Sequence, residues 1–370
     1  MNKIYIILII IIIFYLISSN NNLFENFDGV TDLDEIEKNP IFVSLYTDKG
    51  KKLNVTLISK PFGGPKAYKQ YLVNKPKKIY LGITSYMEFP YIPSNPNDKY
   101  YDVKNDYNGT NDTPSTGNKY HLDMYLDICD GWLHCFNDEK VKKYLPTNKP
   151  KALISESDFV NFKRAKPITP RNERINKKYD YIYSCPKVKE TSTCDDWVSY
   201  NKNWPLAEKC IQIFSDMGLK GLLVGRKGCK VPKNCDTTGW VEYKDMLKLY
   251  DQAKFLFLPN EADASPRVLT ECLSIDLPCL VNKNIIGGWK YVNNNTGEFF
   301  TNETDVKESV TKLMENINSY EPRKYIVENY GPINSGKRLK DFLYKNYKEK
   351  LNIPENEVDF VILRHPLINF

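Results

Sequence analysis

Short apolar runs alternate with amphipathic stretches along most of the chain. In the first half the alternation covers residues 54–59, 67–73, 78–84, 124–136 and 151–155. In the second half we expect strands at residues 179–184, 221–225, 254–259 and 277–282, separated by helices at residues 205–217, 244–253 and 265–276. The second-half strands are apolar throughout, which is typical of strands buried between two helical layers. This pattern predicts βα units built around parallel sheets.

A polar, basic stretch at residues 163–178 separates the two halves and reads as a linker. We therefore predict two Rossmann-like domains, at residues 41–165 and 166–330, followed by a C-terminal helix and tail at residues 331–370. Within the first domain, residues 91–120 are poor in apolar side chains and rich in turn formers, so they are expected to form a long surface loop.

The N-terminus carries Lys3 and then fourteen uninterrupted apolar residues at positions 4–17. No small-residue cleavage pattern follows this run, so a retained membrane anchor within residues 1–20 is favoured over a cleaved signal peptide. Residues 21–40 are polar and acidic and read as a stem. With Lys3 on the inner side, the expected topology is single-pass and type II.

Charge and cysteine usage narrow the function classes. The 52 basic and 46 acidic residues are spread along the chain, without an arginine-rich run, so nucleic acid is not an expected partner. The nine cysteines form no CxxC pair and only three histidines exist, so a structural zinc site is not predicted. The pairs Cys185/Cys194 and Cys229/Cys235 could each close a short disulfide loop, and buried free thiols are the alternative.

The richest candidate chemistry lies in residues 260–282, "NEADASPRVLTECLSIDLPCLVN". Ser265 and Pro266 suit the N-cap and first position of a helix that follows a parallel strand, where free N–H groups bind phosphate. Asp263 lies in the loop before this helix, and Glu271 lies about 7.5 Å along its axis. Two carboxylates around a phosphate site suit a nucleotide-sugar; the alternative is a capped surface helix with a solvated Glu271.

The same stretch resembles the acidic-x7-Glu motif of the group 1 retaining glycosyltransferases. Asp263, Pro266, Glu271 and Pro278 stand at the motif positions, and the flanking "GLLVG", "TGWVEYKDMLKLYDQAKFLFLPN" and "NIIGGWKYVNNNTGEFF" are also similar to family segments. The resemblance covers about residues 179–320. Three positions depart from the usual pattern, in which Asp263 would be Glu, Asp276 would be Gly and Tyr291 would be an acid.

The resemblance implies an α/β fold of GT-B architecture, with two Rossmann-like domains whose parallel sheets face a cleft. It implies that Asp263 holds hydroxyls of the transferred sugar and that Glu271 holds the ribose. Basic residues near the start of the second domain would hold the diphosphate. Arg226 is the first choice, and the further candidates are Lys227, Lys187, Lys189 and Lys202. The helix start would add Ser265, Pro266 and Arg267.

In the first domain the resemblance is weaker. Gly63 and Gly64 would form a glycine loop near donor and acceptor, and an ordinary turn is the alternative. Asp158 ends a strand where relatives often carry a His-Asp pair, which makes it a candidate catalytic residue. Asp130 and His134 flank another strand, and His134 is expected to be a core histidine.

The expected activity is transfer of a sugar from a nucleotide-diphosphate sugar to a glycan, lipid or protein acceptor, with retention and without a metal. Three alternatives remain: an epimerase of the same fold, a dinucleotide oxidoreductase, and a catalytically inactive, membrane-anchored structural protein. The oxidoreductase would need a G-x-G-x-x-G turn, and "GRKGCK" at residues 225–230 lacks its last glycine.

Overall fold

The computed structural model describes residues 42–60, 65–85, 89–90, 125–187, 189, 193–195 and 197–363. The expected anchor and stem, the surface loop at residues 91–120 and the glycines Gly63 and Gly64 lie outside these ranges. Within the described ranges, no helix is both long and apolar enough to cross a membrane.

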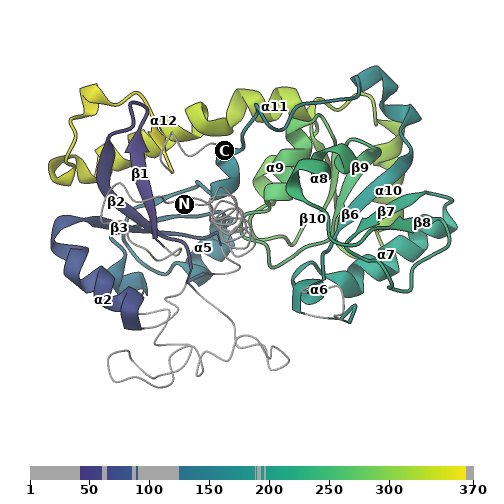
Figure 1. The fold of residues 1–370 in the computed structure, drawn as a ribbon, viewed down its shortest axis with the longest axis horizontal. Coiled ribbons are helices and arrows are strands. Elements are labelled where there is room, and N and C mark those ends of the chain that lie inside the picture. Colours follow the sequence, from purple (N-terminus) through teal and green to yellow (C-terminus); the bar gives the residue numbers. More distant parts are fainter. Residues whose placement is uncertain are drawn as a thin grey trace, which may run out of the picture.

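Two six-stranded sheets form two lobes that lie side by side (Figure 1). The first sheet has the order β12-β1-β2-β3-β4-β5. Its strands are β1 (Phe42–Thr47), β2 (Lys52–Ile58), β3 (Ile79–Ile83), β4 (Gly131–Leu133), β5 (Lys151–Ala152) and β12 (Val361–Ile362). From β2 to β5 the strands are parallel, as expected. The other edge departs from that expectation, because β1 runs antiparallel to both β2 and β12.

The second sheet is parallel throughout and has the order β11-β10-β9-β6-β7-β8. Its strands are β6 (Tyr179–Ser184), β7 (Gly221–Val224), β8 (Cys235–Thr237), β9 (Ala253–Leu258), β10 (Cys279–Asn282) and β11 (Gly297–Phe300). The chain passes from β6 to β7 and β8 on one side and then returns to β9 on the other. The order therefore reverses between β6 and β9, which is where doubly wound sheets bind ligands.

Alternating side chains of β9 supply the two faces of the second sheet. Phe255 and Phe257 pack with one core cluster, together with α7 (Trp204–Asp216), and Leu256 and Leu258 pack with the other, together with α9 (Arg267–Ser274). The period of two in the strand thus buries it between helical layers, as its continuous apolar sequence predicts. The lobe is completed by α6 (Trp197–Asn201), α8 (Tyr243–Tyr250), α10 (Val306–Glu315) and α11 (Pro322–Asn329).

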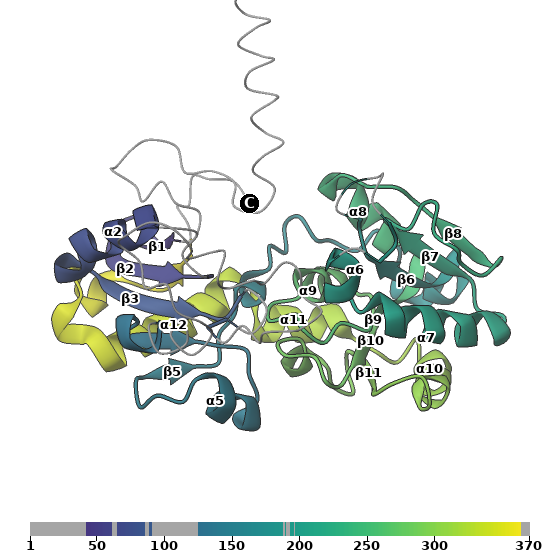
Figure 2. The same cartoon turned by 90° about the horizontal axis from the view of Figure 1, so that it is seen from below.

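The first lobe is covered by α2 (Pro65–Asn74), α5 (Asp138–Tyr144) and α12 (Gly331–Tyr347). The long helix α12 returns from the second lobe to the first (Figure 1). Its apolar residues Leu339, Phe342 and Leu343 are buried in the same cluster as Val43 and Leu57 of the first sheet. The chain therefore crosses between the lobes twice, once through residues 160–178 and once through α11 and α12 (Figure 2). Short 3₁₀ turns include Glu156–Phe159, Arg171–Asn176 and Trp289–Tyr291.

Candidate functional site

The loops that follow β6 and β9 bring together two residues that are far apart in the sequence. Lys202 follows α6, on the connection that leaves β6, and Asp263 lies in the loop that leaves β9. The Lys202 ammonium donates a hydrogen bond of 3.0 Å to Oδ2 of Asp263. This ion pair therefore lies at the reversal of strand order, where a ligand of a doubly wound sheet is expected.

Asp263 is held by three donors. Besides Lys202, the Asn260 amide donates to Oδ2 over 3.0 Å and the backbone N–H of Ser265 donates to Oδ1 over 3.3 Å. Burial alone would raise the pKa of Asp263, but the charge of Lys202 and these hydrogen bonds hold it below its ordinary value. The carboxylate is therefore ionised at neutral pH and fixed in orientation.

The loop of Asp263 also contacts the loop that follows β10. The backbone N–H of Gly287 donates to the carbonyl of Asp263 over 3.0 Å. A Cβ at Gly287 would lie 1.8 Å from the carbonyl oxygen of Ala264, so only glycine fits this approach. The glycine pair seen in the sequence thus supports the backbone next to Asp263.

Glu271 lies on α9 in a different electrostatic setting. Burial raises its pKa to about 7, and the charge of Arg267 and a hydrogen bond with Tyr243 offset this only in part. Tyr243, at the start of α8, is 44% exposed, and Glu271 itself is partly exposed. The site therefore combines one carboxylate that is ionised at pH 7 with one that titrates near it.

The start of α9 differs from the expectation by one to two residues. The helix begins at Arg267, and Pro266 rather than Ser265 occupies the N-cap position, without a side-chain cap. Ser265 turns toward the first lobe, where its hydroxyl lies 2.8 Å from Oγ of Ser157 and accepts from the Ser157 backbone N–H over 3.0 Å. Arg267 is exposed and interacts with Glu271. Ser265 thus links the lobes, which explains why it does not cap the helix.

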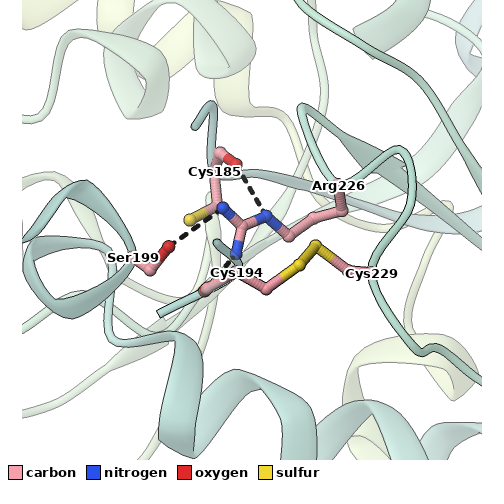
Figure 3. Close-up of a disulfide and its surroundings, with 5 residues drawn as sticks. All are labelled: Cys185, Cys194, Ser199, Arg226 and Cys229. Atoms are coloured by element: carbon pink, nitrogen blue, oxygen red, sulfur yellow. Dashed lines mark hydrogen bonds between the residues drawn. A yellow bond between two sulfur atoms is a disulfide. The ribbon is translucent and has the colours of Figure 1, made fainter. Parts of the chain in front are cut away.

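The geometry argues against the diphosphate contact expected of Arg226. Its side chain is fully buried and donates to the carbonyls of Cys185 and Cys194 and to the Ser199 hydroxyl (Figure 3). Its guanidinium also lies over the Trp204 ring. Because this buried guanidinium already donates to three protein acceptors, it has no exposed N–H group to offer a phosphate. Lys227 is exposed, and its backbone N–H donates a hydrogen bond to the Thr238 carbonyl.

Asp158 also differs from its expected role. It is fully buried, and its carboxylate accepts from the Tyr291 hydroxyl, from the Lys290 ammonium and from the Ser155 backbone N–H. Lys290 and Tyr291 belong to the second lobe, so Asp158 bridges the lobes. A carboxylate with these partners and no exposure is placed to hold structure rather than to exchange protons with a substrate.

Two expectations for the first domain have simple outcomes. Gly63 and Gly64 lie outside the described residues, so their role remains a prediction. His134 is buried, and burial, followed by the charge of Lys290, lowers its pKa to about 4. A neutral, buried imidazole is consistent with the core histidine expected from the sequence.

From the sequence, Lys202 was only a further candidate for the diphosphate contact, and Tyr243 was not identified. The signal for Lys202 was present, because it directly precedes α7 on the first connection of the second sheet. Its partner Asp263 is distant in sequence, so only the fold reveals the pair. In the described residues, no group of three or more His, Cys, Asp or Glu side chains is arranged to hold a metal ion.

Comparisons with known proteins bear on the family and on the fold. Residues 225–330 match the family described as glycosyl transferases group 1. No curated protein matches the chain.

Among solved structures, the sucrose-phosphate synthase of Thermosynechococcus elongatus superposes with a TM-score of 0.54 at 10% identity, over 77% of this chain and 72% of that one. HepE of Anabaena, crystallised with UDP-glucose, gives 0.51 at 9% identity, over 76% and 77%. S. aureus TarM, crystallised with UDP among other ligands, gives 0.50 at 13% identity, over 75% of this chain and 54% of TarM.

At such low identities the solved structures establish the fold, and the family match covers the segment that contains Asp263 and Glu271. The family match thus identifies residues 225–330 as a group 1 glycosyltransferase segment, and the solved structures show that the chain has the two-domain GT-B architecture.

Proposed function

We propose that this enzyme transfers a sugar from a nucleotide-diphosphate sugar to a glycan, lipid or protein acceptor, with retention of the anomeric configuration. The donor lies against the second lobe, over the reversal point between β6 and β9. Asp263 accepts hydrogen bonds from hydroxyls of the transferred sugar, Lys202 contacts the diphosphate, and Glu271 accepts from the ribose hydroxyls.

The observation that carries this proposal is the 3.0 Å contact between Lys202 and Asp263 at the entrance to α9. A cation and an anion side by side match a ligand in which phosphate adjoins a hydroxyl-bearing sugar. The positive end of α9 lies next to them, and Glu271 lies further along that helix. Sugar, diphosphate and ribose can then be arranged in that order.

In the free enzyme Lys202 and Asp263 neutralise each other. When the donor binds, its diphosphate competes for the Lys202 ammonium, and the sugar hydroxyls replace Lys202 as donors to Asp263. Lys202 then stabilises the charge that develops on the departing diphosphate. Since Asp158 is buried between the lobes, the departing phosphate itself takes the proton of the acceptor hydroxyl in this scheme.

The nucleotide is the first property to test, because HepE and TarM were crystallised with UDP-glucose and UDP. The purified protein is screened by thermal shift with UDP, GDP and ADP and with their glucose conjugates. A ligand that binds only the native state raises the melting temperature by mass action. Failure of every nucleotide to shift it would count against a donor site.

Transfer is then followed with a panel of acceptors and the preferred donor, and the anomer of the product is assigned by NMR. A product that forms without acceptor would indicate an epimerase instead. Donor binding without any turnover, including hydrolysis, would favour an inactive binding protein.

The apolar run at residues 4–17 is proposed to anchor the enzyme in a membrane, on the evidence of the sequence. The full chain should sediment with membranes and resist carbonate extraction, whereas residues 21–370 should remain in the supernatant and retain nucleotide affinity. Extraction of the full chain by carbonate would overturn the anchor.

A further inference from the structure

One disulfide joins two loops at the edge of the candidate donor site. Cys194, on the connection that leaves β6, is bonded to Cys229, in the loop that leaves β7, across a sequence separation of 35 residues (Figure 3). This pairing differs from both loops considered from the sequence, because Cys185 and Cys235 are free and buried. The disulfide therefore ties together two neighbouring strand connections rather than closing either one.

Arg226 reinforces the same junction. Its Nε donates to the Cys185 carbonyl over 2.9 Å, and Nη1 donates to the Cys194 carbonyl over 2.9 Å. Its Nη2 donates to the Ser199 hydroxyl, in α6, over 3.0 Å. A single guanidinium from the β7 loop thus holds three points of the connection that leaves β6, and the disulfide lies beside it (Figure 3).

The backbone at the base of this junction is equally close. Gly225, directly before Arg226, has a φ of +81°, and a Cβ there would lie 2.4 Å from Cα of Pro186. The end of β7 is therefore pressed against the chain that leaves β6, and this contact aims Arg226 into the connection.

The supported connection is the one that presents Lys202. Ser199 lies within α6, which leads directly to Lys202, and the Tyr183 hydroxyl donates to the Lys202 carbonyl over 3.0 Å. Tyr183 stacks on Trp204, the ring that also lies under the Arg226 guanidinium. Arg226, through Ser199, and Tyr183, through the Lys202 carbonyl, thus hold the segment from which the Lys202 side chain reaches Asp263.

We propose that the Cys194–Cys229 disulfide and Arg226 are positioning elements for donor binding. They hold α6 so that Lys202 meets the diphosphate, and the enzyme binds its donor tightly only when this disulfide is formed. This inference rests on the proposed function, and it assigns the Arg226 side chain to shaping the site rather than to contacting phosphate. It also implies that the active enzyme works in an oxidising compartment.

The distribution of thiols makes the inference testable by mild reduction. Cys194 and Cys229 are partly exposed, whereas the seven free cysteines in the described part of the chain are all buried. Dithiothreitol transfers two electrons and two protons to the disulfide, which yields two thiols, and is itself oxidised to its cyclic disulfide. Under native conditions this reaction is directed at the one accessible bond.

The experiment compares the oxidised protein, the reduced protein and the Cys194→Ser/Cys229→Ser double variant. Amide hydrogen exchange of α6 is measured without ligand, and UDP, GDP and ADP affinities are measured by titration. We expect faster exchange in α6 and a loss of affinity of about tenfold, equivalent to losing one charge-assisted hydrogen bond to phosphate. Reductant should have no further effect on the double variant.

Arg226→Lys supplies an independent arm, because it keeps the charge but loses the three-way hydrogen bonding. It should raise KM for the donor much more than it lowers kcat. Asp276→Gly, which acts on stability at a distance from α6, serves as the control for a merely structural effect and should leave nucleotide affinity unchanged.

Unchanged α6 exchange and unchanged affinity after reduction would overturn the proposal. If the oxidised wild type binds none of the three nucleotides, the proposed function fails instead, and the exchange of α6 still decides whether the disulfide positions this segment.

Discussion

At the scale of single residues, Asp276 shows how a departure from the family pattern is compensated. It stands where glycine is usual and has a φ of +63°. Its carboxylate accepts from the Arg171 and Arg174 guanidinium groups and from the backbone N–H of Arg323. Arg174 is almost fully buried, so Asp276 supplies its counter-charge. These hydrogen bonds, which join the linker to α11, offset the cost of the strained backbone at Asp276.

Asp276→Gly should therefore destabilise the protein although it restores the usual residue. Relief of the left-handed backbone returns about 1–2 kcal/mol, and leaving Arg174 buried without its partner costs about 3–5 kcal/mol. We expect a net loss of about 1–4 kcal/mol in the free energy of unfolding, measured in urea at neutral pH. Asp276→Asn, which keeps an acceptor oxygen, should lose less. A glycine variant as stable as the wild type would contradict this account.

Glu271 gives the site a pH dependence. Its pKa is raised by burial to about 7, so the carboxyl is mostly protonated below that pH and cannot accept from two ribose hydroxyls as an anion. Nucleotide affinity should therefore rise with pH and level off above about 8, approaching tenfold per pH unit below the pKa. The measurement is titration with UDP-glucose, which has no terminal phosphate group to titrate, between pH 5.5 and 8.5.

The raised pKa of Glu271 affects folding stability in the opposite direction, because stability falls as pH rises whereas nucleotide affinity increases. A raised carboxyl pKa contributes stability that is complete below the unfolded value, 4.5, and is lost as pH rises through about 7. Glu271→Gln should remove both effects, with a flat affinity profile and a melting temperature that gains on the wild type as pH rises. Parallel affinity profiles for wild type and variant would show that Glu271 does not titrate in the site.

At the scale of elements, the two lobes are joined by buried polar contacts. The turn Glu156–Phe159 of the first lobe meets the turn Trp289–Tyr291 of the second through the Asp158–Lys290 ion pair, whose side chains are 0% and 4% exposed. Trp289 adds a bond of 2.7 Å to the Cys135 carbonyl. Both turns follow strands of their own sheets, so this contact fixes the lobes beside the Asp263 loop.

Removing one partner of this pair should cost more than removing both. Asp158→Asn leaves the Lys290 ammonium buried without a counter-charge, a loss of about 3–5 kcal/mol in the free energy of unfolding. Adding Lys290→Met replaces the ammonium with an apolar side chain of similar length and should recover part of that loss. The double-mutant cycle measures the coupling; additive losses would mean that the ion pair does not hold the lobes.

The apolar runs predicted the four central strands of the second sheet, but not its short edge strands β8 and β11. The strand at residues 179–184 coincides with β6, and β7, β9 and β10 lie within two residues of their expected bounds. The acidic pair was also found, because both carboxylates belong to one local segment. The buried position of the Arg226 side chain could not be predicted, because the sequence of a strand and its following loop does not show whether a side chain points into the protein or into solvent. The partners of Asp158, Lys202 and Cys194 are likewise distant in sequence and meet only in the fold.

At the scale of the whole molecule, the first lobe depends on the end of the chain. β12 pairs with the edge strand β1, and the Tyr347 hydroxyl of α12 donates to the carbonyl of Asp130. The short β12 and the reversed β1 carry little periodic signal, so this antiparallel edge was not predicted. The donor-side lobe lies between the two chain crossings, which is why its helices and strands form one continuous segment of sequence.

The central claim is that the segment from Asp263 to Glu271 binds the donor, and a comparison of two variants tests it. Glu271→Gln keeps the shape of the side chain but loses charge-assisted hydrogen bonds to ribose, each worth about 1.5–3 kcal/mol. Asp263→Asn loses the sugar contact and leaves Lys202 free for phosphate. Both variants are titrated with the nucleoside diphosphate and with the intact donor at pH 8, and their melting temperatures are recorded.

The account predicts that Glu271→Gln weakens binding of the free nucleoside diphosphate about ten- to a hundredfold. It predicts that Asp263→Asn leaves that binding at or slightly above the wild-type affinity while sugar transfer collapses. Wild-type nucleotide affinity in a folded Glu271→Gln variant would contradict the assignment of this helix to the donor site.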